Sequence, residues 1–193
     1  QMATYFEENN LLSELQFGFR RGLGTTDALT SLTQATYSGL DGKSKTGALL
    51  FDLSEAFDLV DPLILLQKLA FYGFDSGSLT FFRSYLSGWR QYVDFGGEYS
   101  SMEPLATGVR QGSILGPLLY LIYTNDLPTV ISYVPRATSP EDLLLLSGCD
   151  VISVNAPSCS MAKAIQYADD TTIFISADSH GELSSLTVKI EAA

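Results

Sequence analysis

Apolar side chains recur three and four residues apart in several stretches of the chain, a spacing typical of helices with one buried face. The clearest helix start is Asp61-Pro62, a capping side chain followed by a proline in the first turn, and Gly73 ends the same stretch. Its predicted buried face consists of Leu63, Leu66, Leu69 and Ala70. The predicted helices cover residues 2–15, 25–40, 62–72, 79–86 and 113–126, and a last one begins near Glu182.

Shorter apolar or β-rich runs predict strands. Ala48–Leu53 suits a strand that is buried on both faces and carries Asp52 at its end. Two hairpins are predicted, one around Gly96-Gly97 and one around Ala168-Asp169-Asp170, which places two carboxylates at a turn. Residues 128–163 show no sustained period, and we expect a long irregular connection there.

Composition narrows the class of protein. The 193 residues leave room for one domain, and 46% apolar against 17% charged residues is enough to build a core. The net charge is −11, whereas a protein that grips phosphate backbones is normally basic. Cys149, Cys159 and His180 are too few for a disulfide framework or a zinc module.

The sequence shows neither a secretory signal at its start nor an apolar stretch long enough to cross a membrane. We therefore expect an intracellular location, in the cytoplasm or nucleus, and no membrane partner.

Acidic residues at strand ends are the first sign of chemistry. Aspartate is depleted in strands, and adjacent carboxylates repel each other unless a cation lies between them. If the strands that end in Asp52 and in Asp169-Asp170 are neighbours, their carboxylates converge on a site for hard divalent ions such as Mg²⁺. Two such ions can clamp an in-line phosphoryl displacement. The alternative is that each aspartate is a turn residue or a helix cap.

Three motifs follow one another along the chain: Phe51–Asp58, Gly108–Pro117 and Tyr167–Asp170. In this order they resemble the palm motifs of reverse transcriptases, with the likeness strongest to non-LTR (LINE-type, jockey-like) retrotransposons. Gln16–Arg20 with Thr25–Leu29 is similar to the segment that joins fingers to palm in that family, and Asn125–Pro128 also fits it.

The resemblance implies an α/β (α+β) fold, a palm with partial fingers and without a thumb. A small antiparallel sheet would be backed by the helices that begin near Pro62, Leu79 and Ser113. Residues 1–46 would form the fingers segment and residues 47–193 the palm. The implied activity is RNA-directed DNA polymerisation with two Mg²⁺ ions, or Mn²⁺, on an RNA template, a DNA primer and dNTPs.

The resemblance also implies a role for each residue of the motifs. The metal-binding set would be Asp52, Asp169, a supporting Asp170 and the carbonyl of Leu53. The backbone N–H groups of Glu55 and Ala56 would face the nucleotide phosphates, and Phe57 would exclude a 2′-hydroxyl. The remaining roles are nucleotide-pocket lining for Gln111 and Gly112, primer support for Tyr167, and template or phosphate contact for Arg110.

Two features depart from the family and keep alternatives open. By the resemblance, we expect the chain to begin after the upstream fingers block and to end before the thumb, and we expect little activity in isolation without the fingers, thumb and endonuclease regions of a parent polyprotein. Its acidity opposes nucleic-acid binding. One alternative is a decayed, non-enzymatic remnant that at most binds divalent metal or a protein partner. Another is a two-metal nuclease, which would give Phe57 and Gln111 no role.

Overall fold

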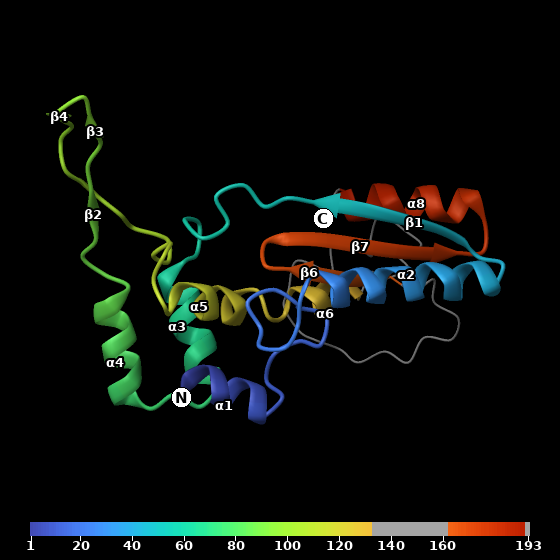
Figure 1. Ribbon diagram of the computed structural model, residues 1–193, viewed down its shortest axis with the longest axis horizontal. Helices are drawn as coiled ribbons and strands as arrows, with labels where there is room; N and C mark the ends of the chain where they lie inside the picture. Colours follow the sequence, from blue (N-terminus) through green and yellow to red (C-terminus); the bar gives the residue numbers. More distant parts are fainter. Residues whose placement is uncertain (133–161, 192–193) are drawn as a thin grey trace, which may run out of the picture.

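A three-stranded antiparallel sheet carries the acidic residues (Figure 1). The computed structural model describes residues 1–132 and 162–191. The strands are β1 (Lys45–Phe51), β6 (Ala162–Tyr167) and β7 (Asp170–Ala177), in the order β1-β7-β6. The β6–β7 hairpin and the strand before Asp52 are therefore confirmed, and the two are neighbours in the sheet.

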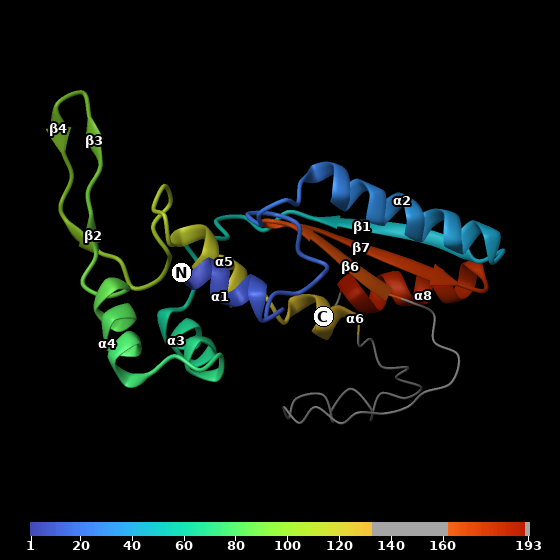
Figure 2. The same ribbon diagram turned by 60° about the horizontal axis from the view of Figure 1, so that its bottom comes forward.

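Two helices cover opposite faces of this sheet, as Figures 1 and 2 show: α2 (Thr25–Asp41) and α8 (His180–Glu191). A Cβ added at Gly39 of α2 would lie 2.3 Å from the Thr46 methyl group, so helix and strand touch closely. The next strand residue, Gly47, faces Leu183 of α8 instead, because successive side chains alternate between the two faces.

The prediction that the first strand is buried on both faces is wrong. β1 lies at the edge of the sheet, and the side chain of Leu50 is 81% exposed. A continuous apolar run does not distinguish an edge strand from a central one.

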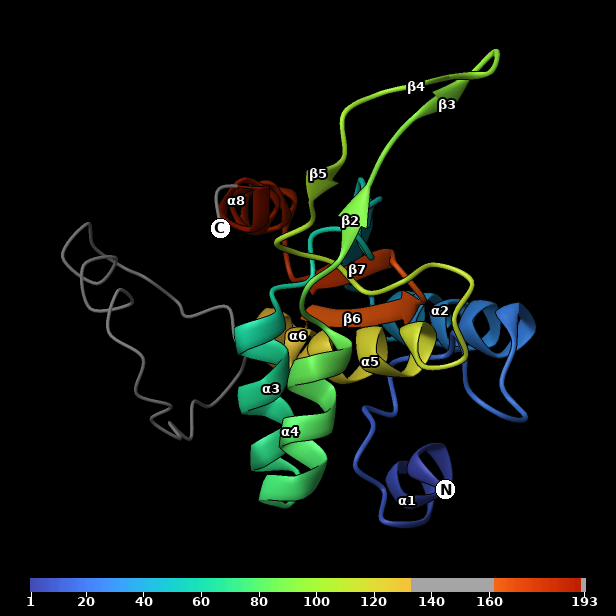
Figure 3. The ribbon, with the colours of Figure 1, turned by 90° about the vertical axis from the view of Figure 1, so that its left-hand side faces the viewer.

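A second apolar core lies beside the sheet and joins four helices: α1 (Met2–Glu8), α3 (Pro62–Phe71), α4 (Ser76–Tyr85) and α5 (Gly116–Tyr123). Figure 3 shows α3 and α4 side by side. The prediction that the helices near Pro62, Leu79 and Ser113 back the sheet is therefore wrong, because they pack on one another instead. The helices that pack on the sheet are α2, α8 and the short α6 (Leu127–Ser132).

The start of α3 follows the prediction. The Asp61 carboxylate accepts hydrogen bonds from the N–H groups of Leu63 (2.7 Å) and Ile64 (3.3 Å), and Pro62 occupies the first turn. The buried face differs from the prediction: Leu63 is 70% exposed and Ala70 is also exposed. The residues that reach the core are Leu65, Leu66 and Leu69.

Two predicted helices are shorter in the structure. The first ends at Glu8, and residues 9–15 form an irregular loop. The helix predicted over residues 113–126 covers only Gly116–Tyr123, and the Ser113 hydroxyl lies before it in the loop, where it accepts a hydrogen bond from the Gly116 N–H at 2.9 Å. After α5 the chain turns and continues as α6, so part of the predicted connection 128–163 is helical. Its last two residues, 162 and 163, begin β6, and residues 133–161 lie outside the described residues.

The predicted hairpin around Gly96-Gly97 is confirmed, and it projects away from the helices (Figure 3). Both turn glycines have positive φ, 62° and 87°, which suits a tight turn between antiparallel strands. The hairpin contains four two-residue strands: β2 (Arg90–Gln91), β3 (Asp94–Phe95), β4 (Glu98–Tyr99) and β5 (Glu103–Pro104). β3 pairs with β4 next to the turn, and β2 pairs with β5 further from it. Across residues 1–132 and 162–191, no helix is long and apolar enough to span a membrane.

Candidate active site

The three candidate aspartates lie at the same end of the sheet. Asp52 directly follows β1, and the last residue of β1, Phe51, pairs with Thr171 of β7. Asp170 begins β7, and Asp169 sits in the two-residue turn between β6 and β7. The pairing of β1 with β7 thus brings together residues that are far apart in the sequence, and it meets the condition on which the predicted convergence depended.

The chemistry of these side chains fits a divalent cation, since carboxylates are the oxygen ligands that Mg²⁺ and Mn²⁺ accept. Asp52 and Asp170 are exposed and Asp169 is half-buried. In the part of the chain that the structure describes, no three acidic, histidine or cysteine side chains form a group compact enough to hold a metal. The backbone therefore brings the three candidate aspartates to one end of the sheet, while their side chains do not form a compact group.

Aromatic rings form a stack beside this acidic end. The Phe57 ring lies over that of Tyr120 in α5, with 4.5 Å between centroids and 24° between planes. Phe19 meets the Phe57 ring edge-on at 5.9 Å. Phe57 is half-buried and rests on α5, so one part of its ring is packed and another part is accessible.

Tyr120 links this stack to the acidic residues. Its side chain is buried, and its hydroxyl has no hydrogen-bond partner among the described residues. Burial, and secondarily the negative charge of Asp169, raise the pKa of Tyr120 to about 12. The hydroxyl is therefore close enough to Asp169 for the two groups to interact electrostatically.

We expect Tyr120→Phe to leave stability at pH 8 unchanged or raise it by about 1 kcal/mol, because a buried hydroxyl without a partner is costly. The folded state keeps the phenol proton from pH 10 to about 12, whereas the unfolded chain loses it, so the unaltered chain should lose stability over that range. At pH 11 the unaltered chain should have lost about 1.4 kcal/mol of its free energy of unfolding relative to the Tyr120→Phe variant. Urea unfolding at pH 8 and pH 11 measures both effects.

Tyr99→Phe, which removes an exposed phenol from the hairpin, is the control and should show neither effect. A clear loss of stability at pH 8 in Tyr120→Phe would mean that the hydroxyl is hydrogen-bonded after all.

The segment that contains Gln111 is tied to the segment that contains Phe57. The Val109 N–H donates to the Phe57 carbonyl at 2.8 Å, and the Gly108 N–H donates to the Val60 carbonyl at 2.8 Å. Gly108 has φ of +102°, and a Cβ there would lie 3.0 Å from the Asp58 carbonyl oxygen, so glycine suits this crossing. Phe57 and Gln111 therefore belong to one surface.

Gln111 itself is exposed, as is Gly112. The Gln111 amide lies 3.4 and 3.5 Å from the two Asp58 carboxylate oxygens, at the long limit for a hydrogen bond. Its side chain is thus weakly held and available to a ligand.

A turn after β1 leaves two backbone N–H groups open. Glu55 has φ of +56°, and its carbonyl accepts hydrogen bonds from the N–H groups of Asp58 and Leu59. Within the described residues, the N–H groups of Glu55 and Ala56 donate no hydrogen bond. Leu53, which precedes this turn, is exposed. Open N–H groups at a tight turn suit an anion.

Arg110 and Tyr167 lie at the margins of this surface. The Arg110 guanidinium stacks on the Trp89 ring at 3.4 Å from its centroid, and the Trp89 indole N–H donates to the Tyr85 carbonyl. Arg110 remains exposed, with its in-plane N–H groups free to meet an acceptor. Tyr167 is half-buried, and it pairs with Asp170 across the β6–β7 turn.

Sequence analysis did not identify Gln16 as a site residue. Its side chain is 2% exposed and bonds to the turn that carries Asp169: the amide NH₂ donates to the Ala168 carbonyl, and the amide oxygen accepts from the Ala168 N–H, both at 3.1 Å. The Gly18 N–H donates to the same oxygen at 2.8 Å. The available signal was a glutamine two residues before a glycine, within the motif Gln16–Arg20.

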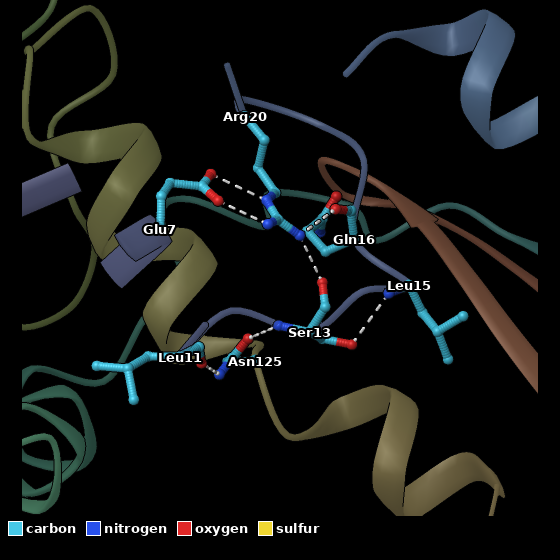
Figure 4. Close-up of polar contacts among 7 residues, drawn as sticks. All are labelled: Glu7, Leu11, Ser13, Leu15, Gln16, Arg20 and Asn125. Atoms are coloured by element: carbon cyan, nitrogen blue, oxygen red, sulfur yellow. Dashed lines mark hydrogen bonds and ion pairs between the residues drawn. The ribbon is translucent and has the colours of Figure 1, made fainter. Parts of the chain in front are cut away.

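The loop around Gln16 is fixed by further polar contacts (Figure 4). The Arg20 guanidinium forms a two-pronged ion pair with Glu7 at 2.6 and 3.0 Å, and this pairing lowers the pKa of the Glu7 carboxyl. Arg20 also donates to the carbonyls of Ser13 and Gln16. From the turn between α5 and α6, the Asn125 side chain accepts from the Ser13 N–H at 2.7 Å.

Comparison with known proteins shows to which family the chain belongs. The family profile described as "Reverse transcriptase (RNA-dependent DNA polymerase)" matches residues 1–192. The chain is 36% identical, over 76% of its length, to a probable RNA-directed DNA polymerase from transposon BS of Drosophila melanogaster. It is 30% identical, over 85% of its length, to the RNA-directed DNA polymerase from mobile element jockey of the same species. It spans only 16% and 18% of these two relatives.

Solved structures agree on the fold. Telomerase from Candida albicans, in complex with a fragment of telomeric RNA, superposes with a TM-score of 0.60 at 13% identity, covering 100% of this chain and 32% of that one. Apo telomerase from Candida tropicalis gives 0.59 at 13% identity, covering 98% and 34%. With the matched profile and the jockey and BS relatives, the acidic sheet end and the three palm motifs establish that this chain belongs to the reverse transcriptase family, as a domain of the non-LTR retrotransposon type.

Proposed function

We propose that the chain forms the palm of an RNA-directed DNA polymerase, with residues 1–46 as part of the fingers and residues 47–193 as the palm. Its substrates are an RNA template, a DNA primer and deoxynucleoside triphosphates. The observation that carries the proposal is the meeting of Asp52 with Asp169 and Asp170 at one end of adjacent strands. The Phe57 and Gln111 surface beside them provides the place for a nucleotide.

In this proposal Asp52, Asp169 and Asp170 hold two Mg²⁺ or Mn²⁺ ions, with the Leu53 carbonyl as a further ligand. Bound ions of this kind supply the charge neutralisation that the attacking and leaving oxygens of phosphoryl transfer require. The exposure of Asp52 and Asp170 supports this role, because carboxylates at an open strand end can turn toward a cation.

The nucleotide lies between the acidic end and the aromatic stack. The open N–H groups of Glu55 and Ala56 bind its phosphates, and Gln111 with Gly112 lines the base and sugar. Gly112 has φ of +76°, and nothing lies within 4 Å of a Cβ placed there, so the chain offers bare backbone to a ligand. The roles of Tyr167 at the primer end and Arg110 at a phosphate complete the proposal.

A chimera tests this function. The jockey polymerase aligns with this chain over 165 residues, so this chain can replace the aligned segment and receive the regions that surround it there. We expect primer extension on poly(rA)/oligo(dT) with Mg²⁺, and little or none from the 193-residue chain alone. A chimera that is folded by circular dichroism yet inactive under these conditions would overturn the proposal.

Phe57→Val should relax the choice of sugar. The ring rests on Tyr120 and cannot retreat, so it leaves no space for a 2′-hydroxyl, whereas valine opens that space. In the chimera, we expect the ratio of ribonucleotide to deoxynucleotide incorporation to rise about 10- to 200-fold, the range for a change in pocket size. Single-nucleotide incorporation with rUTP and dTTP measures it.

Phe81→Val makes the same change at an exposed ring of α4 and should leave the ratio unaltered. An unchanged ratio in Phe57→Val as well would mean that the ring is only a core aromatic.

A non-enzymatic remnant is the second candidate. The spread of the acidic side chains among the described residues and the net charge of −11 favour it, since both oppose a cation-dependent nucleic-acid site. Primer extension by the chimera separates the two, because the remnant can still bind a divalent ion but cannot transfer a nucleotide. Extension with Mg²⁺ supports the polymerase, and a folded but inactive chimera supports the remnant. Mn²⁺ titration of the 193-residue chain, followed by line broadening of the Ala168 amide resonance, tests only whether the acidic end of the sheet binds the ion.

A further inference from the structure

The turn that carries Asp169 has an uncommon backbone. Ala168, the first residue of the turn, has φ of +59°, in the left-handed region that residues with a Cβ rarely adopt. A turn of this kind is held by its surroundings, because the chain itself favours other conformations. Asp169 follows directly, so any rotation of the Ala168 peptide changes where the carboxylate lies.

The Gln16 side chain forms hydrogen bonds with both polar backbone groups of Ala168. Its amide donates to the Ala168 carbonyl and accepts from the Ala168 N–H, so one side chain satisfies both polar groups of the residue. The same amide oxygen accepts from the Gly18 N–H, which fixes the orientation of the amide. The contacts are buried, where a hydrogen bond is stronger than in water and an unpaired group is costly.

The backbone around Gln16 is docked onto the same hairpin. The Phe17 N–H donates to the Gln166 carbonyl and the Gln166 N–H donates to the Leu15 carbonyl, each at 2.8 Å. A Cβ on Gly18 would lie 2.1 Å from the Ala168 nitrogen, so the loop and the turn are in direct contact. The Arg20 and Asn125 contacts tie the other side of this loop to α1 and to the turn that follows α5.

We infer that Gln16 is a positioning residue for the polymerase reaction: its amide clamps the Ala168 peptide and thereby sets the Asp169 carboxylate toward the cation. This inference rests on the proposed function, in which Asp169 is a metal ligand. Gln16 itself touches neither nucleotide nor metal. Residues that orient a ligand in this way commonly change metal affinity or activity by about 10- to 100-fold when they are removed.

The chain supplies a matched control for this clamp. Gln166 is as deeply buried as Gln16 and sits opposite it in the bridge between loop and strand. Its side-chain nitrogen and oxygen have no hydrogen-bond partner among residues 1–132 and 162–191. Glutamine to methionine keeps the length of the side chain at either position, and only at Gln16 does it delete hydrogen bonds.

The first test measures the clamp in the 193-residue chain without any ligand. We expect the Ala168 amide to exchange its hydrogen at least about tenfold faster in Gln16→Met, the factor for one lost buried hydrogen bond, and at the original rate in Gln166→Met. If Gln16→Met does not fold, Gln16→Glu replaces it. The glutamate keeps both acceptor contacts but cannot donate to the Ala168 carbonyl when ionised, so acidification should slow exchange at Ala168 by more than it slows exchange of the same amide in the unaltered chain.

The second test measures the consequence for Asp169. Mn²⁺ titration should show about 10- to 100-fold weaker binding in Gln16→Met than in Gln166→Met. In the chimera, kcat for primer extension should fall by a similar factor while the KM for dTTP stays the same, because the nucleotide surface is untouched.

Equal exchange rates and equal Mn²⁺ affinities in the two methionine variants would overturn the inference. If the unaltered chain binds no Mn²⁺, the proposed function fails instead, and the Ala168 exchange rates still decide whether the clamp exists.

Discussion

Asp169→Asn should reduce primer extension by the chimera about a thousandfold, the factor that corresponds to a loss of roughly 4 kcal/mol of transition-state stabilisation. Asparagine keeps the shape of the side chain but removes the charge that a divalent cation needs from its ligand. The Gln16 clamp holds only the backbone of the preceding residue, so it remains intact in this variant.

The control is Asp178→Asn, which removes the same charge from an exposed position just beyond the far end of β7. It should retain full extension. Mn²⁺ broadening of the Ala168 amide in the 193-residue chain should disappear with Asp169→Asn and persist with Asp178→Asn. Retained extension in Asp169→Asn would show that Asp169 is only a turn residue.

Gly18→Ala should destabilise the chain by about 3 kcal/mol, at the upper end of what overpacking costs. The added Cβ would lie 2.1 Å from the Ala168 nitrogen and 2.8 Å from its Cα, so two backbone segments must separate. Both are held by buried hydrogen bonds, which leaves no flexible side chain to move aside. Urea unfolding followed by circular dichroism measures the loss.

Gly77→Ala provides the matched comparison. Gly77 lies in α4, where a Cβ would be 3.5 Å from the Asp75 carboxylate, an ordinary contact. It should stabilise the chain by about 0.5 kcal/mol through the helix preference for alanine. A Gly18→Ala variant as stable as the unaltered chain would mean that the loop does not pack on the β6–β7 turn.

Local sequence patterns were sufficient to predict the helices and strands that hold the candidate site residues. The cap of Asp61, the glycine turn at Gly96-Gly97 and the hairpin that ends in Asp169 and Asp170 depend on residues a few positions apart. The predicted convergence of Asp52 on that hairpin depended on the condition that the two strands are neighbours, and the β1–β7 pairing meets that condition. The assigned roles of the individual side chains remain predictions.

Features that depend on contacts between distant parts of the chain could not be predicted from local sequence patterns. Periodicity extended the first helix to residue 15, but Asn125 binds the Ser13 N–H and the Leu11 carbonyl, which fixes an irregular loop instead. An amphipathic helix shows that it has a buried face without showing what covers it, so α5 was assigned to the sheet when it packs on α3. The contact of Gln16 with Ala168 is equally non-local.

The pairing of β1 with β7 also has a consequence for biosynthesis. β6 and β7 are joined by a two-residue turn and can pair within microseconds of leaving the ribosome. β1 is synthesised much earlier than β7, its partner in the sheet. Until β7 has been made, both edges of β1 remain unpaired. An exposed apolar strand in that state is prone to aggregate. The acidic end of the sheet is therefore assembled only after β7 has been synthesised, and a nascent chain that stops earlier holds Asp52 on an unpartnered strand.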